Sequence, residues 1–381
     1  MIRGLLFAVM AMPVLAAPLV PDPPLINADA YILIDHATGT VIAEKQADQR
    51  LPPASLTKLM TAYILAEEVS QGRLNLEDSV TVSRNAWSQN PTFSGSSLMW
   101  IEPGKTVTVA ELEKGIVISS GNDATVAIAE HIAGTEAAFA DLMNRYAQEL
   151  GLSATHYRNS HGLPAEGHET SARDLAALAS ATIRNHPDRY AIYKQQTFTY
   201  NNISQRNRNK LLFEDPTVDG LKTGYTSVAG YGLVASAERN GMRLVSVVLG
   251  SASTRSRAVE TKSLLNYGFR FFETLSPLKA GQELGIAPVW QGLSDTVRVG
   301  VASDITLTAA RSKQTPAISY AVDEALRAPI EAGQTLGDVT VSVEGEILAQ
   351  LPLVALDAVE QAGFFARLWD AFLLWLNGLF G

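Results

Sequence analysis

The hydrophobic pattern of the chain opens with a hairpin and continues into helices. Residues 31–35 and 41–44 are strand-like runs on either side of a turn that contains Gly39. From residue 57 to about residue 184, apolar side chains recur at helical spacing, with loops such as residues 90–97 between them. A hairpin followed by several helices is typical of the beginning of a mixed α and β domain.

Strand-like runs return after the helices. They cover residues 220–224, 232–237 and 244–249, and a helical pattern from about residue 255 to 275 follows them. Because strands stand at both ends of this region, we expect one antiparallel sheet to join the two ends, with a helical subdomain between them in the sequence. The predicted fold class is therefore α+β, over residues 25–277.

A second domain of different character is predicted after residue 277. Residues 278–360 contain four runs in which apolar and polar side chains alternate with period two, at 296–301, 304–308, 317–322 and 339–343. These runs predict a small all-β sandwich. It carries no cluster of candidate catalytic residues, so two roles stay open: a spacer, or a module that contacts another protein.

Residues 362–381 predict an amphipathic helix. At about 100° per residue, one half of the helical wheel is filled by Phe, Trp and Leu side chains, and the other half carries Arg367 and Asp370. The segment is too short and too charged for a comfortable membrane span, but it suits the membrane interface with its aromatic face buried. The alternative is a helix docked on the β-rich domain.

The other end of the chain predicts a signal peptide over residues 1–17. Arg3 precedes an apolar stretch from Leu5 to Leu15, and Ala16 and Ala17 supply the small residues of a cleavage site. A retained anchor is the alternative, but the stretch is short for a membrane span. The two ends together predict a periplasmic protein held at the outer face of the cytoplasmic membrane.

Composition narrows the chemistry. A chain of 381 residues with 46% hydrophobic and 18% charged residues can bury full cores. A formal net charge of −9, without a basic stripe, argues against a nucleic-acid partner. The lack of cysteine excludes a thiol nucleophile, disulfides and thiolate metal ligands, and the six histidines lack the spacing of a metal site. We therefore expect neither a metal nor a cofactor.

Candidate chemistry lies where the helices begin. Ser55 and Lys58 share one face if their segment is helical, so the amine can reach the hydroxyl and take its proton. The Pro-Pro pair at residues 52–53 predicts an extended entry into this helix. The same Ser/Lys spacing recurs at residues 276–279, so spacing alone does not decide, and a capping serine with a solvated lysine is the alternative.

Two further elements carry candidate site residues. Residues 120–122, Ser-Gly-Asn, stand between two helical patterns, and their glycine predicts a turn that presents Ser120 and Asn122. A simple helix cap is the alternative. Residues 222–224, Lys-Thr-Gly, lie on a strand-like run, and Gly224 lets a substrate approach the backbone closely. The plain alternative here is a strand end at a hairpin.

Together and in this order, the three elements resemble the signature of penicillin-binding proteins and serine β-lactamases, whose fold is the β-lactamase/transpeptidase-like domain. Residues 53–61, 119–124, 219–224 and 268–274 bring the resemblance closest to the low-molecular-mass penicillin-binding proteins that are serine-type D-Ala-D-Ala carboxypeptidases, peptidase family S11. It extends over essentially the whole chain. It implies an enzyme that removes the terminal D-alanine from peptidoglycan stem pentapeptides, which limits cross-linking and affects cell shape, and that binds β-lactams covalently.

The resemblance also implies a role for each matched residue. Ser55 would attack the carbonyl between the two terminal D-alanines and form an acyl-enzyme, with Lys58 as the base. Ser120 would relay a proton to the leaving nitrogen, and Asn122 would bind the peptide backbone. Lys222 would supply positive charge near the substrate carboxylate and, with burial, help to keep Lys58 neutral.

The remaining matched residues are implied to bind the substrate. Thr223 and Gly224 complete the third element, and the backbone N–H groups of the nucleophile and of Tyr225 would form the oxyanion hole. Arg257 falls where a cation meets the terminal carboxylate, with Arg255 as a nearby competitor. Tyr225 departs from the histidine or threonine usual at its position, so the resemblance assigns no role to its ring.

Rival activities share this chemistry. An endopeptidase that cuts peptide cross-links would use the same residues, and so would a penicillin-binding sensor that deacylates slowly. A class A β-lactamase is disfavoured because no glutamate between the second and third elements has an asparagine four residues later. A high-molecular-mass transpeptidase would carry a large domain before Ser55. Residues 161–163 and 171–175 also resemble the family and predict a loop and a helix cap that frame the site.

Overall fold

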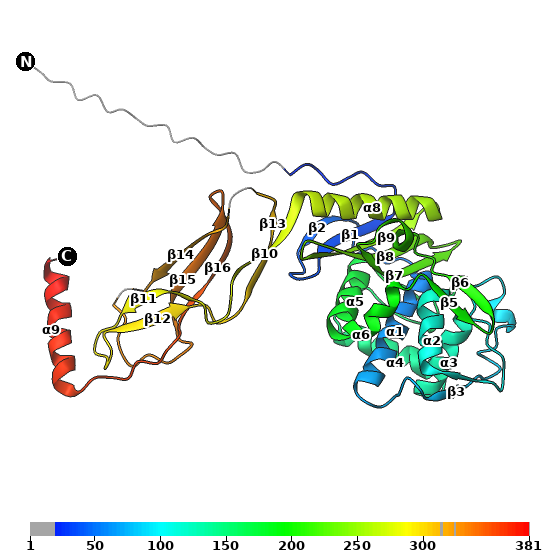
Figure 1. The fold of residues 1–381 in the computed structure, drawn as a ribbon, viewed down its shortest axis with the longest axis horizontal. Coiled ribbons are helices and arrows are strands. Elements are labelled where there is room, and N and C mark those ends of the chain that lie inside the picture. Colours follow the sequence, from blue (N-terminus) through cyan, green and yellow to red (C-terminus); the bar gives the residue numbers. More distant parts are fainter. Residues whose placement is uncertain (1–19, 313–314, 324, 381) are drawn as a thin grey trace, which may run out of the picture. The chain divides into compact units, whose positions relative to one another are not determined.

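The computed structural model describes residues 20–312, 315–323 and 325–380, which fall into two units (Figure 1). One unit spans Asp22–Arg270, and the other continues from Phe271. The predicted signal peptide, residues 1–17, lies outside the described residues.

The Asp22–Arg270 unit is built on a five-stranded antiparallel sheet. Its strands, in spatial order, are β2 (Val41–Lys45), β1 (Ala30–Asp35), β9 (Met242–Ser251), β8 (Gly230–Arg239) and β7 (Val218–Thr226). In β1, Ile32 lies opposite Glu44 of β2 on one side and Val247 of β9 on the other. The hairpin at the start of the region therefore joins strands from its end, and the prediction of one shared sheet is confirmed.

Helices cover both faces of this sheet (Figure 1). On one face lies α8 (Thr254–Phe271), where a Cβ at Gly268 would come within 2.6 Å of Leu244, so the helix approaches the sheet closely. On the other face lies α5 (Ala172–Asn185), which packs against β1 and β9. Because both faces are covered, β1 is buried along its whole length.

The helical subdomain surrounds α1 (Lys58–Ser70), whose residues 58–66 are all buried. A helix that is covered on all sides needs apolar residues all round, which explains the long apolar run after Lys58. Ser171 caps α5 by accepting the N–H of Asp174 at 3.1 Å, as the sequence predicts. The other elements are β3 (Ser79–Thr81), β4 (Thr106–Thr108), α2 (Val109–Lys114), α3 (Asn122–Ala133), α4 (Glu136–Glu149), α6 (Pro187–Tyr190), β5 (Thr197–Tyr200), β6 (Ile203–Arg206) and α7 (Leu211–Glu214).

The helix α8 ends earlier than its pattern predicts. Residues 272–278 form the strand β10 (Phe272–Leu278), which pairs with β13 (Ile305–Ala310) in the second unit. The predicted helix to residue 275 is wrong because a short run of aromatic and apolar residues suits a helix and a strand equally well. The second unit therefore begins at Phe271, before the expected boundary after residue 277.

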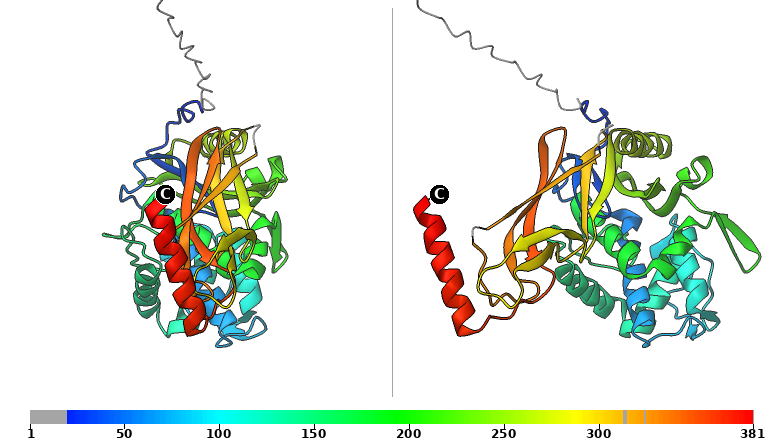
Figure 2. Two further views of the ribbon diagram at one scale, coloured as in Figure 1. Left: turned by 90° about the vertical axis from the view of Figure 1, so that its left-hand side faces the viewer. Right: turned by 60° about the vertical axis from the view of Figure 1, so that its left-hand side comes forward.

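The second unit holds the all-β fold that the alternating runs predict. Besides the β10–β13 pair it has a five-stranded antiparallel sheet, in which the long strands β15 and β16 run side by side (Figure 2). Leu278 of the small sheet and Val339 and Leu353 of the large one share a core. In spatial order the large sheet is β11 (Glu283–Pro288), β12 (Thr296–Gly300), β16 (Glu346–Ala355), β15 (Thr335–Val343) and β14 (Ala317–Val322).

The final described element is α9 (Phe364–Phe380), the C-terminal helix that the sequence predicts. Several of its aromatic side chains are exposed, from 47% at Phe372 to 84% at Phe365. Asp370, on the polar half of the wheel, accepts a hydrogen bond from the backbone N–H of Gln291 at 2.7 Å. The helix thus touches the β-rich domain through a polar residue. In the described parts of the chain, no helix is long and apolar enough to cross a membrane.

Candidate active site

Ser55 lies in a 3₁₀ turn, Ala54–Thr57, directly before α1. Pro53 has helical backbone angles, φ −74° and ψ −21°, so the predicted extended entry is wrong. Proline fixes only its own φ, and no proline follows Pro53 to exclude a helical ψ. The chain instead turns at Ala54, whose φ of 50° lies in the left-handed region. That region costs an L-residue roughly 1–2 kcal/mol, so the surrounding structure must hold the turn.

Two glycines make room for this serine turn. A Cβ at Gly162 would lie 1.8 Å from the carbonyl oxygen of Ala54, and one at Gly224 would lie 3.0 Å from that of Pro53. Gly162 also has a φ of 91°, which only glycine adopts readily. At Gly224 the missing side chain leaves room for the serine turn itself, whereas the sequence predicts room for a substrate. The loop at Gly162 and the strand β7 therefore close on Ala54 from two directions.

The amine of Lys58 is surrounded by oxygens. Its Nζ lies 3.2 Å from Ser55 Oγ, 2.6 Å from Asn122 Oδ1 and 2.7 Å from the carbonyl oxygen of His161. Amide and carbonyl oxygens only accept hydrogen bonds, so the latter two take both N–H bonds of a neutral amine. The nitrogen lone pair is then left for the hydroxyl proton of Ser55. Asn122 and His161 thus orient a neutral Lys58 amine toward Ser55.

The surroundings of Lys58 favour the neutral amine. Its side chain is 1% exposed, and burial together with the nearby Arg208 guanidinium lowers its pKa to about 7. The resemblance implies burial and neighbouring cations as the cause, with help from Lys222. The pKa of Lys222 is itself held well below its ordinary value, by burial first and then by Lys58. Arg208 is therefore the cation that the sequence does not reveal.

Ser120 and Lys222 form a second serine–lysine pair. Lys222 Nζ donates hydrogen bonds to Ser120 Oγ at 2.9 Å and to the carbonyl oxygen of Thr223 at 3.0 Å. Ser120 and Lys222 are both buried, at 2% and 3% exposed. A hydroxyl held by a buried amine in this way can pass a proton in either direction.

The turn that presents Ser120 is built differently from its prediction. The chain after α2 forms a π-helical turn, Gly115–Ser119, and Ser120 itself takes the left-handed conformation, with φ 60°. Gly121 has an ordinary φ of −63°, but a Cβ there would lie 2.8 Å from the backbone nitrogen of Met99. Glycine is needed at this position for close packing rather than for a left-handed backbone.

A cavity of about 770 Å³ opens over Ser55. Arg257, from α8, is 6% exposed and lines this cavity, whereas Arg255 lines a separate surface hollow with Leu25 and Ile26. This separation favours Arg257 over its competitor. Among the expected site residues, the cavity is lined by Ser55, Ser120, Asn122, Thr223, Gly224, Tyr225 and Arg257.

The ring of Tyr225 belongs to an aromatic stack in the cavity wall. It lies on Tyr231 with ring centroids 4.2 Å apart and an angle of 25° between the planes. The Arg257 guanidinium lies 5.6 Å from the centroid of Tyr231 and donates to the carbonyl oxygen of Gly224 at 3.1 Å. The stack therefore supports the arginine, and Tyr225 itself remains 52% exposed.

Comparison with known proteins agrees with this arrangement. Residues 18–253 match the family model described as D-alanyl-D-alanine carboxypeptidase, and residues 272–361 match that of the penicillin-binding protein 5 C-terminal domain. The chain belongs to the D-alanyl-D-alanine carboxypeptidase family, S11. D-alanyl-D-alanine carboxypeptidase DacA of Escherichia coli strain K12 is 45% identical over 367 residues, which are 95% of this chain and 91% of that relative.

Solved structures show the same family and fold. Penicillin binding protein 5 from Haemophilus influenzae is 41% identical, with a TM-score of 0.82 over 90% of this chain and 100% of that one. Penicillin-binding protein D2 from Listeria monocytogenes, in an ampicillin-bound form, is 30% identical, with a TM-score of 0.58 over 65% of this chain and 100% of that one. The predicted serine-type D-Ala-D-Ala carboxypeptidase and its two-domain fold class are confirmed.

The carboxypeptidase cavity contains an arginine that the sequence analysis missed. Arg208 lines it between two asparagines that bond to their own backbone segment: Asn207 Oδ1 accepts the N–H of Asn209 at 3.0 Å, and Asn209 Oδ1 accepts that of Leu211 at 3.1 Å. Asparagines of this kind stabilise tight turns. The Asn-Arg-Asn run at residues 207–209 is the signal that could have revealed it.

A buried carboxylate, also missed, fixes the carboxypeptidase's second element. Asp123 accepts the backbone N–H groups of Met99 at 2.8 Å and Trp100 at 2.7 Å. The neighbouring Asn122 donates from Nδ2 to Ser96 Oγ at 2.9 Å. The adjacent side chains of Asn122 and Asp123 thus attach the start of α3 to the loop that contains Ser96, Met99 and Trp100.

Proposed function

We propose that Ser55 is the nucleophile and Lys58 its general base in the D-Ala-D-Ala carboxypeptidase reaction. The observation that carries this proposal is the set of contacts at Lys58 Nζ, which lies 3.2 Å from Ser55 Oγ and is also bonded to the two acceptor oxygens of Asn122 and His161. Because burial lowers the pKa of Lys58 to about 7, the amine is available as a base near neutral pH.

The proposed reaction acylates the serine and then hydrolyses the ester. Ser55 Oγ bonds to the carbonyl carbon of the penultimate D-alanine, and its proton passes to Lys58. The C–N bond to the terminal D-alanine breaks as Ser120, hydrogen-bonded to Lys222, relays a proton to the leaving nitrogen. The backbone N–H groups of Ser55 and Tyr225 stabilise the oxyanion. Water then cleaves the ester and returns a proton to the serine oxygen.

The proposed substrate is the stem pentapeptide of peptidoglycan. Its terminal carboxylate binds Arg257 and Thr223, which line the cavity together with Gly224. Asn122 uses its oxygen for Lys58 and one N–H for Ser96, which leaves its second N–H for a carbonyl of the substrate backbone. The same serine opens the ring of β-lactams, a step supported by the ampicillin-bound form of the Listeria relative.

The proposed location is the outer face of the cytoplasmic membrane, in the periplasm. The exposed Phe365 and Trp375 of α9 support burial of this helix in the membrane interface, and the contact of Asp370 with Gln291 directs a polar residue toward the protein. The apolar stretch in residues 1–17 supports export. The β-rich domain then serves as a spacer between the membrane and the catalytic domain.

A single assay tests the activity. Purified protein and a Ser55→Ala variant are incubated with a stem pentapeptide and with a cross-linked peptide dimer. We expect free D-alanine from the pentapeptide with the native protein and none with the variant. Cleavage of the dimer alone would assign an endopeptidase, and labelling by a fluorescent penicillin without peptide turnover would assign a sensor. D-alanine release by Ser55→Ala at the full rate would contradict Ser55 as the nucleophile.

A further inference from the structure

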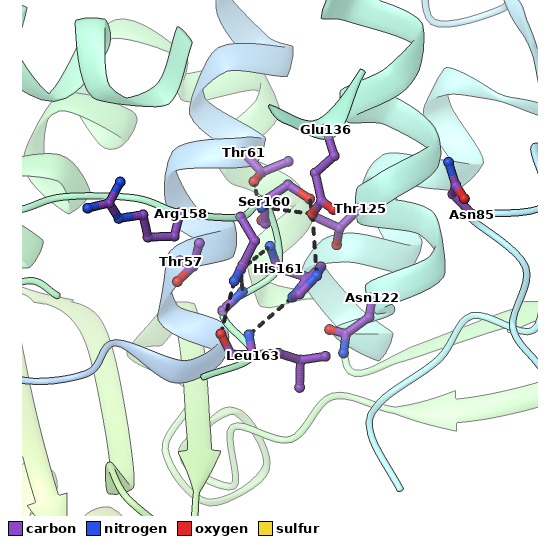
Figure 3. A network of polar contacts seen from close by, with 12 residues as sticks. Thr57, Thr61, Asn85, Asn122, Thr125, Glu136, Arg158, Ser160, His161 and Leu163 are labelled. Carbon is purple, nitrogen blue, oxygen red and sulfur yellow. Dashed lines mark hydrogen bonds and ion pairs between the residues drawn. The ribbon is translucent and has the colours of Figure 1, made fainter. Parts of the chain in front are cut away.

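The carboxylate of Glu136 binds one loop of the site through a single oxygen (Figure 3). Glu136 lies in the first turn of α4, and its Oε1 accepts the backbone N–H of Ser160 at 3.0 Å and the Ser160 hydroxyl at 2.7 Å. His161 Nε2 lies 3.3 Å from the same oxygen. Glu136 therefore holds Ser160 by two hydrogen bonds and lies close to the ring of the next loop residue, His161.

The hydrogen bonds of His161 define its orientation. Its Nδ1 accepts the backbone N–H of Leu163 at 3.1 Å, so the ring proton sits on Nε2 and points at Glu136. Burial, followed by the nearby Lys58 and His168, lowers the pKa of His161 to about 3, so the ring is neutral at working pH. The contact with Glu136 is thus a close approach of 3.3 Å between a neutral imidazole N–H and a carboxylate.

The same two loop residues hold α1 through their carbonyl groups. Ser160 O accepts the hydroxyl of Thr61 at 2.7 Å, and His161 O accepts Lys58 Nζ at 2.7 Å. Lys58 and Thr61 are one helical turn apart, on one face of α1. The loop therefore binds α1 with its acceptors and α4 with its donors, and the place of the His161 carbonyl depends on both.

We propose that Glu136 is a positioning residue for acylation, an inference that rests on the proposed roles of Ser55 and Lys58. Its carboxylate holds Ser160 and His161 so that the His161 carbonyl takes one N–H bond of Lys58 and the amine lone pair stays directed at Ser55. When Glu136 is removed, the carbonyl loses this support and the lone pair is no longer fixed. A misplacement of about 1 Å in a reacting group can lower a rate about 100-fold.

The charge of Glu136 has a separate effect on Lys58. The anions that act on this amine are Glu136 from α4 and Asp123 from α3, and the cation is Arg208. Lys222 of β7 is close enough for Lys58 to lower its pKa, whereas His161 and His168 are neutral. Glu136 favours the ammonium form of Lys58. Its loss should therefore move the acid limb of the pH–rate profile, the part in which the acylation rate rises as Lys58 loses its proton, to lower pH. A structural defect alone would not produce that movement.

The test measures acylation by a fluorescent penicillin across pH, together with the melting temperature, for the full chain. Glu136→Ala should lower the plateau rate about 100-fold. Glu136→Gln should lose less rate, because its amide oxygen still accepts one bond. Both should show the acid limb at lower pH. Ser160→Ala removes only the hydroxyl bond and should give a smaller loss without a shift of the limb.

Two matched controls separate positioning from stability and from charge. Thr135→Ala removes the cap of α4, where Thr135 Oγ1 accepts the N–H of Ala138 at 3.1 Å, and it should lower the melting temperature at an unaltered acylation rate. Glu149→Gln removes the same charge at the other end of α4 and should change neither. Ser55→Ala should not be labelled. Labelling of that variant would overturn the proposed function itself.

The inference fails under two outcomes. One is an unchanged rate and pH profile in both Glu136 variants. The other is a rate loss in the Glu136 variants that Thr135→Ala reproduces at the same fall in melting temperature. If Glu136→Ala does not fold, Glu136→Gln and Ser160→Ala decide by the same criteria.

Discussion

The rate of acylation should follow the protonation of Lys58. The pKa of this amine is lowered from 10.5 to about 7, by burial first and then by Arg208. At pH 7 the neutral fraction rises from roughly 3 in 10,000 at the ordinary pKa to about one half. Since the base must be neutral to take the proton of Ser55, the rate should rise about tenfold per pH unit below about pH 6 and level off above about pH 8.

The perturbation that isolates this effect is Arg208→Gln. Removing the guanidinium should raise the pKa of Lys58, because the positive charge no longer opposes the ammonium form. The acid limb then moves to higher pH and the rate at pH 7 falls. A tenfold fall on the limb corresponds to a rise of about one in the pKa. Arg208→Lys keeps the charge and should leave the limb close to its native position.

Other groups near the site titrate elsewhere or lie apart from it. His161 and His168 have pKa values lowered to about 3 and about 4, mainly by burial, so they do not change charge near neutral pH. Burial raises the pKa of Glu113 to about 7, but this carboxylate pairs with Arg189 of α6 at 3.0 Å. Glu113→Gln is therefore the control for a group that titrates in the same range, and it should leave the limb unchanged.

The assay is the second-order rate of labelling by a fluorescent penicillin, from about pH 5.5 to about pH 9 at constant ionic strength. A rate that stays flat across this range, or that keeps rising about tenfold per pH unit up to about pH 9 without levelling off, would refute a Lys58 of lowered pKa as the base. Identical limbs for the native protein and Arg208→Gln would refute the part assigned to the cation.

Three other changes have defined outcomes. Gly162→Ala should lower the melting temperature and abolish penicillin labelling, because its φ is 91° and the Ala54 carbonyl oxygen occupies the place of a methyl group; normal labelling would show that the loop can move aside. Arg257→Gln should raise KM for the pentapeptide more than it lowers kcat, whereas Arg255→Gln should change neither. The same rise of KM in both variants would contradict Arg257 as the carboxylate partner. A chain that ends at Gly363 should leave the membrane fraction with its carboxypeptidase activity intact; continued sedimentation with membranes would contradict the anchor.

Hydrophobic periodicity was sufficient for most of the fold. The apolar runs of β1, β8 and β9 predict strands, and the sheet that joins the two ends of the catalytic region follows from their order. The error at residues 272–275 has a physical cause. A few apolar residues at the end of a helix contain no information on whether the chain continues as a helix or pairs as a strand, and the partner β13 is more than thirty residues away in sequence.

The site was predictable only as far as its local motifs reach. Ser55, Lys58, Ser120 and Lys222 stand in short recognisable runs, but the contact of Lys58 with the His161 carbonyl joins residues 103 apart in the chain. A sequence pattern does not show which distant carbonyl will face an amine. This is also why Arg208 and Glu136 escaped notice.

Backbone strain was equally invisible. Glycine is the usual signal for a left-handed residue, yet Ala54, beside Ser55, and Ser120 itself are left-handed without being glycine. Of the glycines beside them, Gly121 has an ordinary φ and only makes room for close packing, whereas Gly162 makes room and is itself left-handed, with a φ of 91°. The sequence therefore shows where the chain is crowded more readily than where it is strained.

The two buried lysines explain why the proposed proton path leads from one serine to the other. When Lys58 takes the proton of Ser55, it becomes a cation beside Arg208 and close enough to Lys222 to lower the pKa of that amine. Like charges repel strongly where water is excluded, so the site then favours the loss of a proton. The hydroxyl bonded to Lys222 is that of Ser120, which lines the cavity. In the proposed path a proton released there reaches the leaving nitrogen, and it balances the proton that Lys58 took from Ser55.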